Sequence, residues 1–323
     1  MTNAFVTGGS GFIGGRLVER LVAEGHTVRA LARSDAAAER IQARGGEPVA
    51  GDLSGVDAMR AGATGCELAF HAAAMLGDWG RREDFERGNV DGTRNALTAC
   101  AEAGVHRFVH VGTEAALLAG RPLVNVDETA PLRPDSPVLY SSTKAKAEQL
   151  VLDANREGFE TVVVRPRFVW GRGDTTLLPT MTEMVRSGRW AWIAGGQHRT
   201  STTHVDNTVE GLLLGAQRGR PGNAYFVTDG EPVVFREFVT ELLRTQGVEP
   251  PNRTIPAPVA GALASAGETA WGLLPLPGRP PLTRFAYWAS SQECTIEIDK
   301  AREQLGYSPV RSREEGLAEL RAA

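Results

Sequence analysis

The chain has 323 residues, of which 42% are hydrophobic and 23% charged, and its formal net charge is −4. This balance lacks the basic surface that nucleic acid binding requires, and no stretch approaches the roughly 18 consecutive apolar residues of a membrane span. The three cysteines are scattered and predict no disulfide framework, and neither they nor the six histidines have the spacing of a metal site. The sequence has no basic leader, so we expect no secretion signal. We therefore expect a cytoplasmic protein without a metal.

The first element is a short apolar strand that runs into a glycine-rich turn and then a helix. Gly8, Gly11 and Gly14 are spaced by three, and Phe12 and Ile13 stand at the start of the helix. Such glycines allow a tight turn, close approach of the backbone to a pyrophosphate and close packing of helix on strand. The free N–H groups of the helix start bind the phosphate charge. Because a strand precedes the turn and a helix follows it, the pattern predicts a dinucleotide-binding loop.

Apolar strand patterns then alternate with helical patterns along the chain. This alternation predicts an α/β fold, with a Rossmann-type doubly wound parallel sheet and helices on both faces. The predicted strands are 27–31, 68–73, 108–111, 161–164 and 224–227, and the clearest helix between them is 89–103.

The alternation loosens after about residue 169, where 177–187 has a helical pattern and 250–281 is rich in Pro, Gly and Ala. We predict a smaller, discontinuous substrate-binding lobe beside the main sheet. The predicted domains are a Rossmann domain over 1–169 to which 196–249 returns, a lobe from 170–195 and 250–298, and C-terminal helices over 299–323.

Lysine is rare in this chain, with 3 lysines against 32 arginines, and Lys144 follows Tyr140 by four residues. The stretch 136–155 has the apolar spacing of a helix with Pro137 in its first turn, so both side chains lie on one face. An ammonium can donate to a ribose hydroxyl and a phenolate together, whereas a guanidinium is a wide planar fork. Tyrosine and lysine also occur at this spacing by chance on exposed helices, so the pair alone does not establish a catalytic site.

The glycine loop, the Tyr140 and Lys144 pair, and Thr113 at a strand end together resemble the extended short-chain dehydrogenase/reductase superfamily. Longer segments are similar to its branch of 3β-hydroxysteroid dehydrogenases and related bacterial ketoreductases. These segments are 108–113 (FVHVGT), 140–148 (YSSTKAKAE), 165–171 (RPRFVWG), 204–207 (HVDN) and 298–307 (IDKAREQLGY).

The resemblance implies that Tyr140 donates or accepts the proton, that Lys144 holds the nicotinamide ribose and lowers the tyrosine pKa, and that Thr113 bonds the substrate oxygen. A tyrosine pKa near 10 must fall by about 3 units for the group to act as a base at neutral pH, which corresponds to about 4 kcal/mol. An exposed ion pair contributes only about 0 to 1 kcal/mol. We therefore expect a partly desolvated site in which the positive charge of the oxidised nicotinamide assists the ammonium.

The same resemblance places further cofactor contacts at strand ends: Asp52 and Leu53 at the adenine, Ala72 and Ala73 at the central portion, and Pro166 nearby. Nicotinamide enzymes that use NAD carry an acidic residue after the second strand, where this chain has Ala32 followed by Arg33. Arg33 suits a 2′-phosphate, so we predict NADP(H), with NAD as the alternative. The other interpretation of Arg33 is an ordinary solvated cation.

Two other activities of the superfamily stay open at this point. The sequence pattern of nucleotide-sugar dehydratases resembles Thr-Asp-Glu at this strand end. This chain has Thr113-Glu114-Ala115 there and so lacks the second acid. Epimerisation needs no extra acid and is harder to exclude. A nonenzymatic dinucleotide sensor could share the fold, although such proteins typically lack the Tyr/Lys pair.

The predicted lobe is apolar and aromatic, which favours a hydrophobic substrate over one that carries a diphosphate. We expect a ketone or alcohol of a steroid-like, β-keto acyl or aryl kind. The other interpretation is that these residues simply pack a core. The loop 75–88 is long enough for a flap, with Trp79 and Phe85 toward the substrate, and Glu114 and Arg167 are further candidates for substrate contacts.

Gly261, Gly267 and the shortage of basic residues argue against a membrane-surface role for 259–274. The resemblance alone implies a homodimer formed through the helix that carries Tyr140.

Overall fold

The computed structural model describes residues 2–274 and 276–322, and its centre is a seven-stranded sheet in the order β12-β7-β5-β4-β1-β2-β3. Every pairing in this sheet is parallel, so the predicted Rossmann fold is confirmed. The strands are β1 (Asn3–Thr7), β2 (Thr27–Ala32), β3 (Glu47–Ala50), β4 (Leu68–His71), β5 (Arg107–Val111), β7 (Glu160–Pro166) and β12 (Asn223–Val227).

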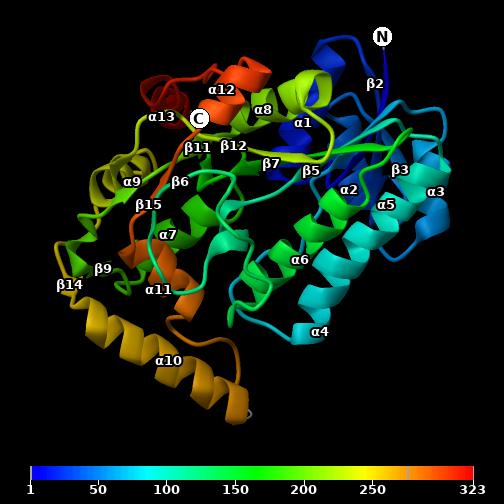
Figure 1. Cartoon of the computed structure of the whole chain (residues 1–323). Helices are drawn as coiled ribbons and strands as arrows, with labels where there is room; N and C mark the ends of the chain where they lie inside the picture. The colour runs from blue at the N-terminus through cyan, green and yellow to red at the C-terminus, as the bar shows by residue number, and fades with distance from the viewer. Residues whose placement is uncertain (1, 275, 323) are drawn as a thin grey trace.

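Helices cover both faces of the sheet, with α1 and α8 on one side and α3, α5 and α6 on the other (Figure 1). Side chains alternate across each strand, so Ala4 and Val6 of β1 enter one core while Phe5 enters the opposite one. The helices around this sheet are α1 (Phe12–Ala23), α2 (Asp35–Gln42), α3 (Val56–Ala63), α4 (Arg82–Phe85), α5 (Gly92–Glu102), α6 (Leu139–Asp153) and α8 (Val205–Arg218).

Two predicted helices are shorter than expected. The helix predicted over 136–155 is α6, which begins at Leu139 because Val138 is still extended as its N-cap (φ −90°, ψ 120°). The helix predicted over 89–103 is α5, and its first turn is replaced by a π-helix, Glu86–Asp91. π-Helical turns inserted into helices occur frequently at functional sites.

A four-stranded sheet, in the order β13-β10-β15-β6, and two two-stranded sheets lie beside the main sheet. A further core beside them is rich in tryptophan and phenylalanine, among them Trp170, Trp192 and Phe238. The predicted domain boundaries stay a prediction. The strands are β6 (Leu123–Val126), β8 (Val169–Trp170), β9 (Trp192–Ile193), β10 (Arg199–Thr200), β11 (Thr203–His204), β13 (Val233–Val234), β14 (Thr254–Ile255) and β15 (Cys294–Ile296), and the helices are α7 (Leu177–Arg186), α9 (Phe235–Arg244), α10 (Ala257–Leu273), α11 (Arg284–Ser291), α12 (Asp299–Leu305) and α13 (Arg313–Ala322).

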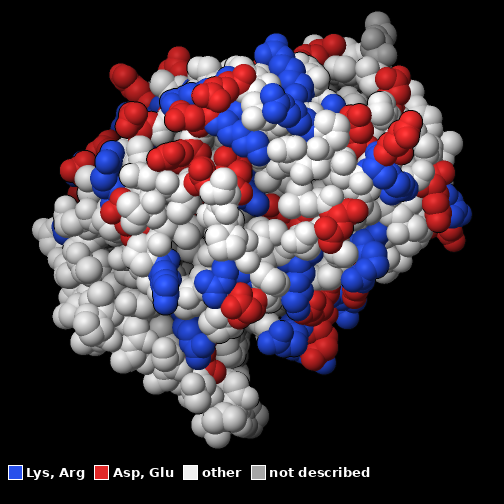
Figure 2. Space-filling view, in the orientation of Figure 1, with Lys and Arg blue, Asp and Glu red and all other residues white. Residues whose placement is uncertain are grey.

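Helix α10 protrudes at one corner of the molecule, and the surface there carries almost no charge in Figure 2. Its outer face exposes Val259, Leu263 and Leu273, the last with 80% of its surface accessible. Within the described residues, no helix combines the length and the apolar character needed to cross a membrane.

Candidate active site

The residues singled out from the sequence follow the carboxyl ends of the sheet strands. Because the seven strands are parallel, these ends meet along one edge, which is where α/β sheets bind their ligands. The glycine loop follows β1, Arg33 follows β2, and Ala72 follows β4. Thr113 lies just past the end of β5, and Pro166 is the last residue of β7. The sheet therefore gathers these positions at one edge.

The glycine loop is shaped so tightly that side chains would not fit in it. Gly8 has a left-handed φ of 77°, and a Cβ on it would lie 2.7 Å from the backbone nitrogen of Ala73. A Cβ on Gly14 would overlap the Gly8 carbonyl, so helix α1 can approach the strand only because the residue is glycine. Gly11 is the exposed N-cap of α1, with only the Gly8 carbonyl near its missing Cβ. The loop leaves the backbone N–H groups of the helix start open to a phosphate, which fits a dinucleotide.

The remaining cofactor candidates lie around this loop. Phe12 and Ile13 form the first turn of α1 and are half-buried. Arg33 is exposed, and within the described part of the chain its guanidinium has no recorded hydrogen bond or ion pair. The Asp52 carboxylate accepts hydrogen bonds from the backbone nitrogen and hydroxyl of Ser54, at 2.8 and 2.6 Å, and these bonds lower its pKa. One of the two Asp52 carboxylate oxygens is therefore already hydrogen-bonded within its own turn.

Leu53 and Ala72 are half-buried supports of the same edge. The Leu53 carbonyl accepts a hydrogen bond from Asn95 of α5 at 2.9 Å, which fixes the backbone after β3. The Ala72 nitrogen donates to the Thr7 carbonyl at 3.1 Å, so the chain after β4 continues beside β1. Their contact with a cofactor stays a prediction.

Helix α6 carries Tyr140 and Lys144 on one face, as their spacing predicted. Tyr140 is half-buried, whereas Lys144 is only 4% exposed. The Lys144 ammonium donates to the Val111 carbonyl at the end of β5 (2.9 Å) and lies 3.3 Å from His110 Nε2. Burial lowers the Lys144 pKa to about 8, although the Glu148 carboxylate raises it. An ammonium has three donors, so one is left after these two partners.

Two buried histidines lie near Lys144, and the sequence analysis did not predict them as site residues. His71 and His110 are each 1% exposed, and their rings stack with centroids 5.3 Å apart. His71 is held at Nδ1 by the Thr7 hydroxyl (2.7 Å) and at Nε2 by the Thr93 hydroxyl (3.0 Å). Burial and the charge of Lys144 lower the pKa of both rings, that of His71 to about 3. The rings are therefore neutral, and His110 can accept from the ammonium. Their positions at the ends of β4 and β5 were the available signal.

Thr113, Glu114 and Arg167 form a chain of buried contacts beside Tyr140. The Thr113 hydroxyl donates to Glu114 Oε2 at 2.8 Å, and Arg167 pairs with Glu114 Oε1 at 2.7 Å. Both members of the ion pair have side chains only 5% exposed. Arg167 also donates to the Thr200 hydroxyl at 3.2 Å. The two charged residues predicted to face the substrate thus bind each other in a buried ion pair.

The Tyr140 pKa differs from the expectation for a catalytic base. Burial raises it well above its usual value, the Glu114 charge raises it further, and hydrogen bonding with Thr113 lowers it. The Lys144 ammonium is held by Val111 and His110. The chain alone therefore holds Tyr140 as a neutral phenol.

The predicted flap is partly helical, because α4 and the start of the π-helix lie within 75–88. Phe85 has no exposed surface, and a Cβ on Gly80 would lie 3.2 Å from its ring. Its ring therefore packs against the loop, and its contact with a substrate stays a prediction. Trp79 is half-exposed, and its contact with a substrate stays a prediction. Asp78 accepts a hydrogen bond from Thr283 at 2.8 Å, which joins the loop to the start of α11.

Helix α11 contributes an aromatic contact to Tyr140. The Phe285 ring meets Tyr140 edge-on, with centroids 5.5 Å apart and an angle of 75°. Trp288 and Leu118 pack in the same small cluster. The surroundings of the Tyr140 ring are therefore apolar.

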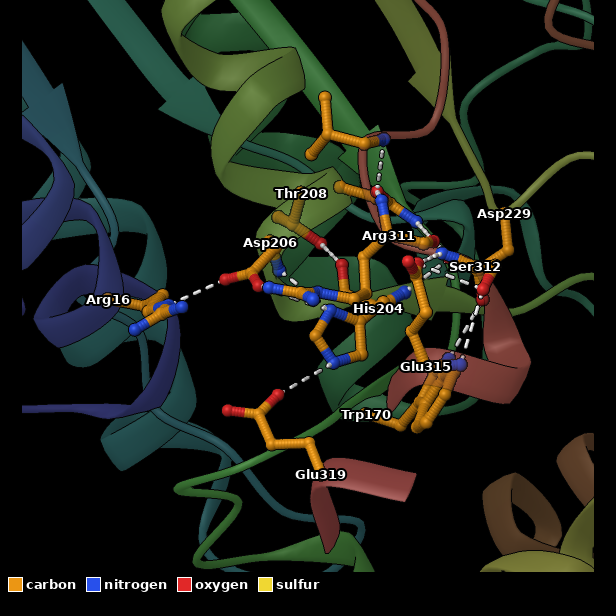
Figure 3. Close-up of polar contacts among 12 residues, drawn as sticks. Arg16, Trp170, His204, Asp206, Thr208, Asp229, Arg311, Ser312, Glu315 and Glu319 are labelled. Carbon is orange, nitrogen blue, oxygen red and sulfur yellow. Dashed lines mark hydrogen bonds and ion pairs between the residues drawn. The ribbon is translucent and has the colours of Figure 1, made fainter. Parts of the chain in front are cut away.

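A second polar cluster joins α1, the start of α8 and the C-terminal segment (Figure 3). His204, Asp206 and Glu319 present atoms within 4.8 Å of one another that could in principle hold a metal ion. However, Arg16 and Arg311 bind the Asp206 carboxylate at 2.5 and 3.4 Å, and His204 Nδ1 accepts from the Asp206 nitrogen at 3.2 Å. The two arginine cations repel a metal ion, and the His204 Nδ1 atom already accepts a hydrogen bond and is not available as a ligand. The cluster therefore joins these three segments through its hydrogen bonds and ion pairs.

The parallel sheet with the glycine loop and the Tyr140, Lys144 and Thr113 positions at one edge, together with the sequence relatives given below, defines the extended short-chain dehydrogenase/reductase class. The model of the 3-beta hydroxysteroid dehydrogenase/isomerase family matches residues 5–257. The chain belongs to this family, and it is an oxidoreductase of the short-chain dehydrogenase type.

Three comparisons illustrate the relationship. The chain is 48% identical over 320 residues to a 4-hydroxy-2-methyl-3-oxo-4-farnesyl-3,4-dihydroquinoline-1-oxide ketoreductase from Stigmatella aurantiaca, covering 99% of this chain and 96% of that one. It is 37% identical over 329 residues to a 2-alkyl-3-oxoalkanoate reductase from Stenotrophomonas maltophilia, covering 98% of each. A dTDP-glucose 4,6-dehydratase from Streptomyces venezuelae, solved with NAD bound, shares the fold with a TM-score of 0.76 and 22% identity, over 99% of this chain and 96% of that one.

Proposed function

We propose that the protein is an NADP(H)-dependent ketoreductase that interconverts a ketone and a secondary alcohol on a hydrophobic small molecule. The observation that carries the proposal is the grouping of Tyr140, Lys144 and Thr113 beside the glycine loop at the carboxyl edge of the sheet. The steroid-like, β-keto acyl and aryl ketones are the substrate classes to examine.

Tyr140 is the proton donor in the reductive direction. A bound reduced nicotinamide would supply the hydride that reaches the carbonyl carbon. As that carbon becomes tetrahedral, the Tyr140 O–H bond breaks and its proton passes to the carbonyl oxygen, which becomes the alcohol hydroxyl. The phenol of Tyr140 is protonated before the reaction, so its proton is available for this step.

Lys144 is the cofactor-orienting member of the set. Its ammonium is fixed by Val111 and His110 below, and its remaining donor is free for a ribose hydroxyl. Thr113 belongs to the same set because it lies just past the end of β5, whose last carbonyl, that of Val111, accepts the hydrogen bond from Lys144. Arg33 supports the preference for NADP(H), because an exposed guanidinium with no recorded partner suits the 2′-phosphate.

The preference for a hydrophobic substrate is supported by two observations. The Tyr140 ring is surrounded by Phe285 and other apolar side chains of the Trp288 cluster. In addition, two relatives that match nearly the whole chain are named for reducing oxo groups on a farnesylated quinoline and on an alkyl chain. Both names describe ketones with large apolar parts.

The nucleotide-sugar alternatives are less well supported. Elimination needs a carboxyl group free to exchange a proton with the sugar, whereas Glu114 is buried in an ion pair with Arg167. An epimerase or a nonenzymatic sensor would be distinguished by turnover. The resemblance also leads us to propose a homodimer formed through α6, which sedimentation analysis would test.

The experiment measures oxidation of NADPH, as loss of its absorbance, by wild type and by Tyr140→Phe. The substrates offered are 3-ketosteroids, β-keto acyl compounds, aryl ketones and nucleotide sugars. We expect oxidation of NADPH by a lipophilic ketone, and a loss of about 10²-fold or more in Tyr140→Phe. Fluorescence titration with NADPH is the control, because the variant should bind the cofactor as wild type does. Turnover of a nucleotide sugar with no reaction of any ketone would refute the proposal.

A further inference from the structure

We propose that His110 is a positioning residue for Lys144: its imidazole accepts a hydrogen bond from the ammonium and, by a change of tautomer, donates one to the neutral amine. Lys144 then offers one donor to the cofactor in either protonation state. This inference rests on the proposed function, in which Lys144 holds the nicotinamide ribose, and it deepens that function by adding a residue to the site.

The first step of the argument is the contact between the two side chains. Lys144 Nζ lies 3.3 Å from His110 Nε2 and donates to the Val111 carbonyl at 2.9 Å. Lys144 and His110 are 4% and 1% exposed, so the contact is shielded from solvent. A neutral imidazole has one nitrogen that donates and one that accepts. Because an ammonium can only donate, the His110 proton must lie on Nδ1 while Lys144 is charged.

The second step concerns the other ring nitrogen of His110. Among the described residues, the buried His110 Nδ1 has no hydrogen-bond partner. The neighbouring His71 ring differs, because the hydroxyls of Thr7 and Thr93 hold its Nδ1 and Nε2 at 2.7 and 3.0 Å. The hydrogen bond at one ring nitrogen normally decides whether the other nitrogen carries the proton. His110 has no such bond at Nδ1, so Lys144 sets its tautomer.

The third step is the loss of one proton from the pair. Burial lowers the Lys144 pKa to about 8, so the charge is lost at mildly alkaline pH. If the ring proton stayed on Nδ1, the neutral pair would keep a buried N–H without a partner, which is costly. The Lys144 proton passes instead from Nζ to His110 Nε2, and the Nδ1 proton leaves to water. The pair loses one proton in total, the ring is neutral before and after, and its N–H donates to the amine.

The consequence is that the contacts around Lys144 Nζ are the same in both states. The ammonium has three protons, of which one goes to Val111 and one to His110. The neutral amine has two protons, gives one to Val111, and accepts from His110 with its lone pair. One donor is therefore left for a ribose hydroxyl in either state. A residue that could only accept would compete with the ribose for the two protons of the amine.

The other titratable groups around this pair have partners of their own or are neutral. On α6 and the elements packed around it, the groups that the structure describes are the half-buried Tyr140 and the buried Cys100, Glu114, Glu148, Arg165 and His71. Glu148 is paired with Arg165, and its charge raises the Lys144 pKa without a recorded hydrogen bond to the ammonium. Glu114 is paired with Arg167. The thiol and the phenol have raised pKa values and stay neutral near pH 8.

The direct test is nitrogen NMR of wild type labelled with ¹⁵N-histidine and ¹⁵N-lysine, from about pH 6 to about pH 10 and without cofactor. The chain has only six histidines and three lysines, and His110→Gln and Lys144→Met assign the two signals. We expect the His110 proton to move from Nδ1 to Nε2 as Lys144 loses its charge, with one midpoint for both residues. His71 is the internal control, and its tautomer should not change, because hydroxyls hold both of its nitrogens.

The second measurement is the Kd of NADPH, by fluorescence titration at about pH 7 and about pH 9. Loss of a ribose hydrogen bond would weaken binding about 3- to 10-fold, so the wild-type Kd should change by less than about threefold across the Lys144 titration. His110→Leu removes the contact and should weaken binding about 3- to 10-fold, whereas His110→Gln, whose amide can accept or donate, should restore it. Thr161→Val removes a buried hydroxyl bonded to the Val151 carbonyl; as the control, it should leave the Kd unchanged.

Three outcomes would overturn the inference. They are a His110 tautomer that stays constant while Lys144 titrates, a Lys144 that stays charged over the whole pH range, and a folded His110→Leu variant that binds NADPH as wild type does. The proposed function fails separately, because neither measurement needs a substrate. The tautomer change and pH-independent NADPH binding in a protein that reduces no ketone would refute the ketoreductase proposal and leave the role of His110 intact.

Discussion

Replacement of Arg33 by alanine gives the sharpest test of the cofactor preference. The guanidinium follows the end of β2 beside the glycine loop, is exposed, and has no recorded partner within the described residues. A charge-assisted pair with a phosphate at such a site contributes about 1 to 2 kcal/mol after solvent screening, so Arg33→Ala should weaken NADPH binding about 5- to 30-fold. NADH lacks the 2′-phosphate, so its Kd should stay within about twofold of wild type.

Fluorescence titration with both nucleotides measures these constants. The matched control is Arg40→Ala, which removes another exposed arginine, from the last turn of α2, and should change neither Kd. Raising the salt concentration should reduce the difference between NADPH and NADH in wild type and not in Arg33→Ala. Equal binding of NADPH and NADH by wild type, or an equal loss of both in Arg33→Ala, would refute the reasoning.

Three further predictions concern buried charge and the flap. Glu148→Ala should lower the free energy of unfolding by about 3 to 5 kcal/mol in urea denaturation, because it leaves Arg165 charged in a site where both side chains are at most 3% exposed; Glu148→Ala/Arg165→Met should recover part of the loss. Lys144 has a folded pKa of about 8, below the ordinary lysine pKa of 10.5, so the folded chain releases its proton first and gains stability as pH rises between these values. The unfolding free energy of wild type relative to Lys144→Met should therefore rise by about 2 to 3 kcal/mol from pH 7 to pH 10, and a constant difference would contradict the lowered pKa. Trp79→Ala should raise KM for a hydrophobic ketone several-fold, whereas unchanged kinetic constants would remove Trp79 from the site.

The edge of the main sheet was predictable because its residues belong to local patterns. The glycine spacing, the strand before it and the helix after it fix where Gly8 and Gly11 lie, and the spacing of four fixes Tyr140 relative to Lys144. β3 escaped prediction because it has only four residues, one of them a proline, and none is fully buried. Its apolar pattern is too short to distinguish a strand from a loop.

Contacts between distant segments could not be predicted in this way. Glu114 and Arg167 are 53 residues apart, and they meet because β5 and β7 are neighbours whose carboxyl ends coincide. His71 and His110 stack because β4 pairs with β5 in a register that places them opposite each other. Sequence spacing carries neither the strand order nor the register, so these partners became visible only in the folded sheet.

The shared fold makes the residue after Thr113 especially informative about the reaction. A dTDP-glucose 4,6-dehydratase has the same fold, so the arrangement of the sheet does not by itself separate ketone reduction from elimination. In this chain the carboxylate at that position is neutralised by Arg167 and occupied by the Thr113 proton, and it cannot serve as an exchanging acid in that state. Its charge acts instead on Tyr140, whose pKa it raises. One ion pair, formed between two strand ends, therefore both occupies the carboxylate that elimination would need and opposes ionisation of the Tyr140 phenol.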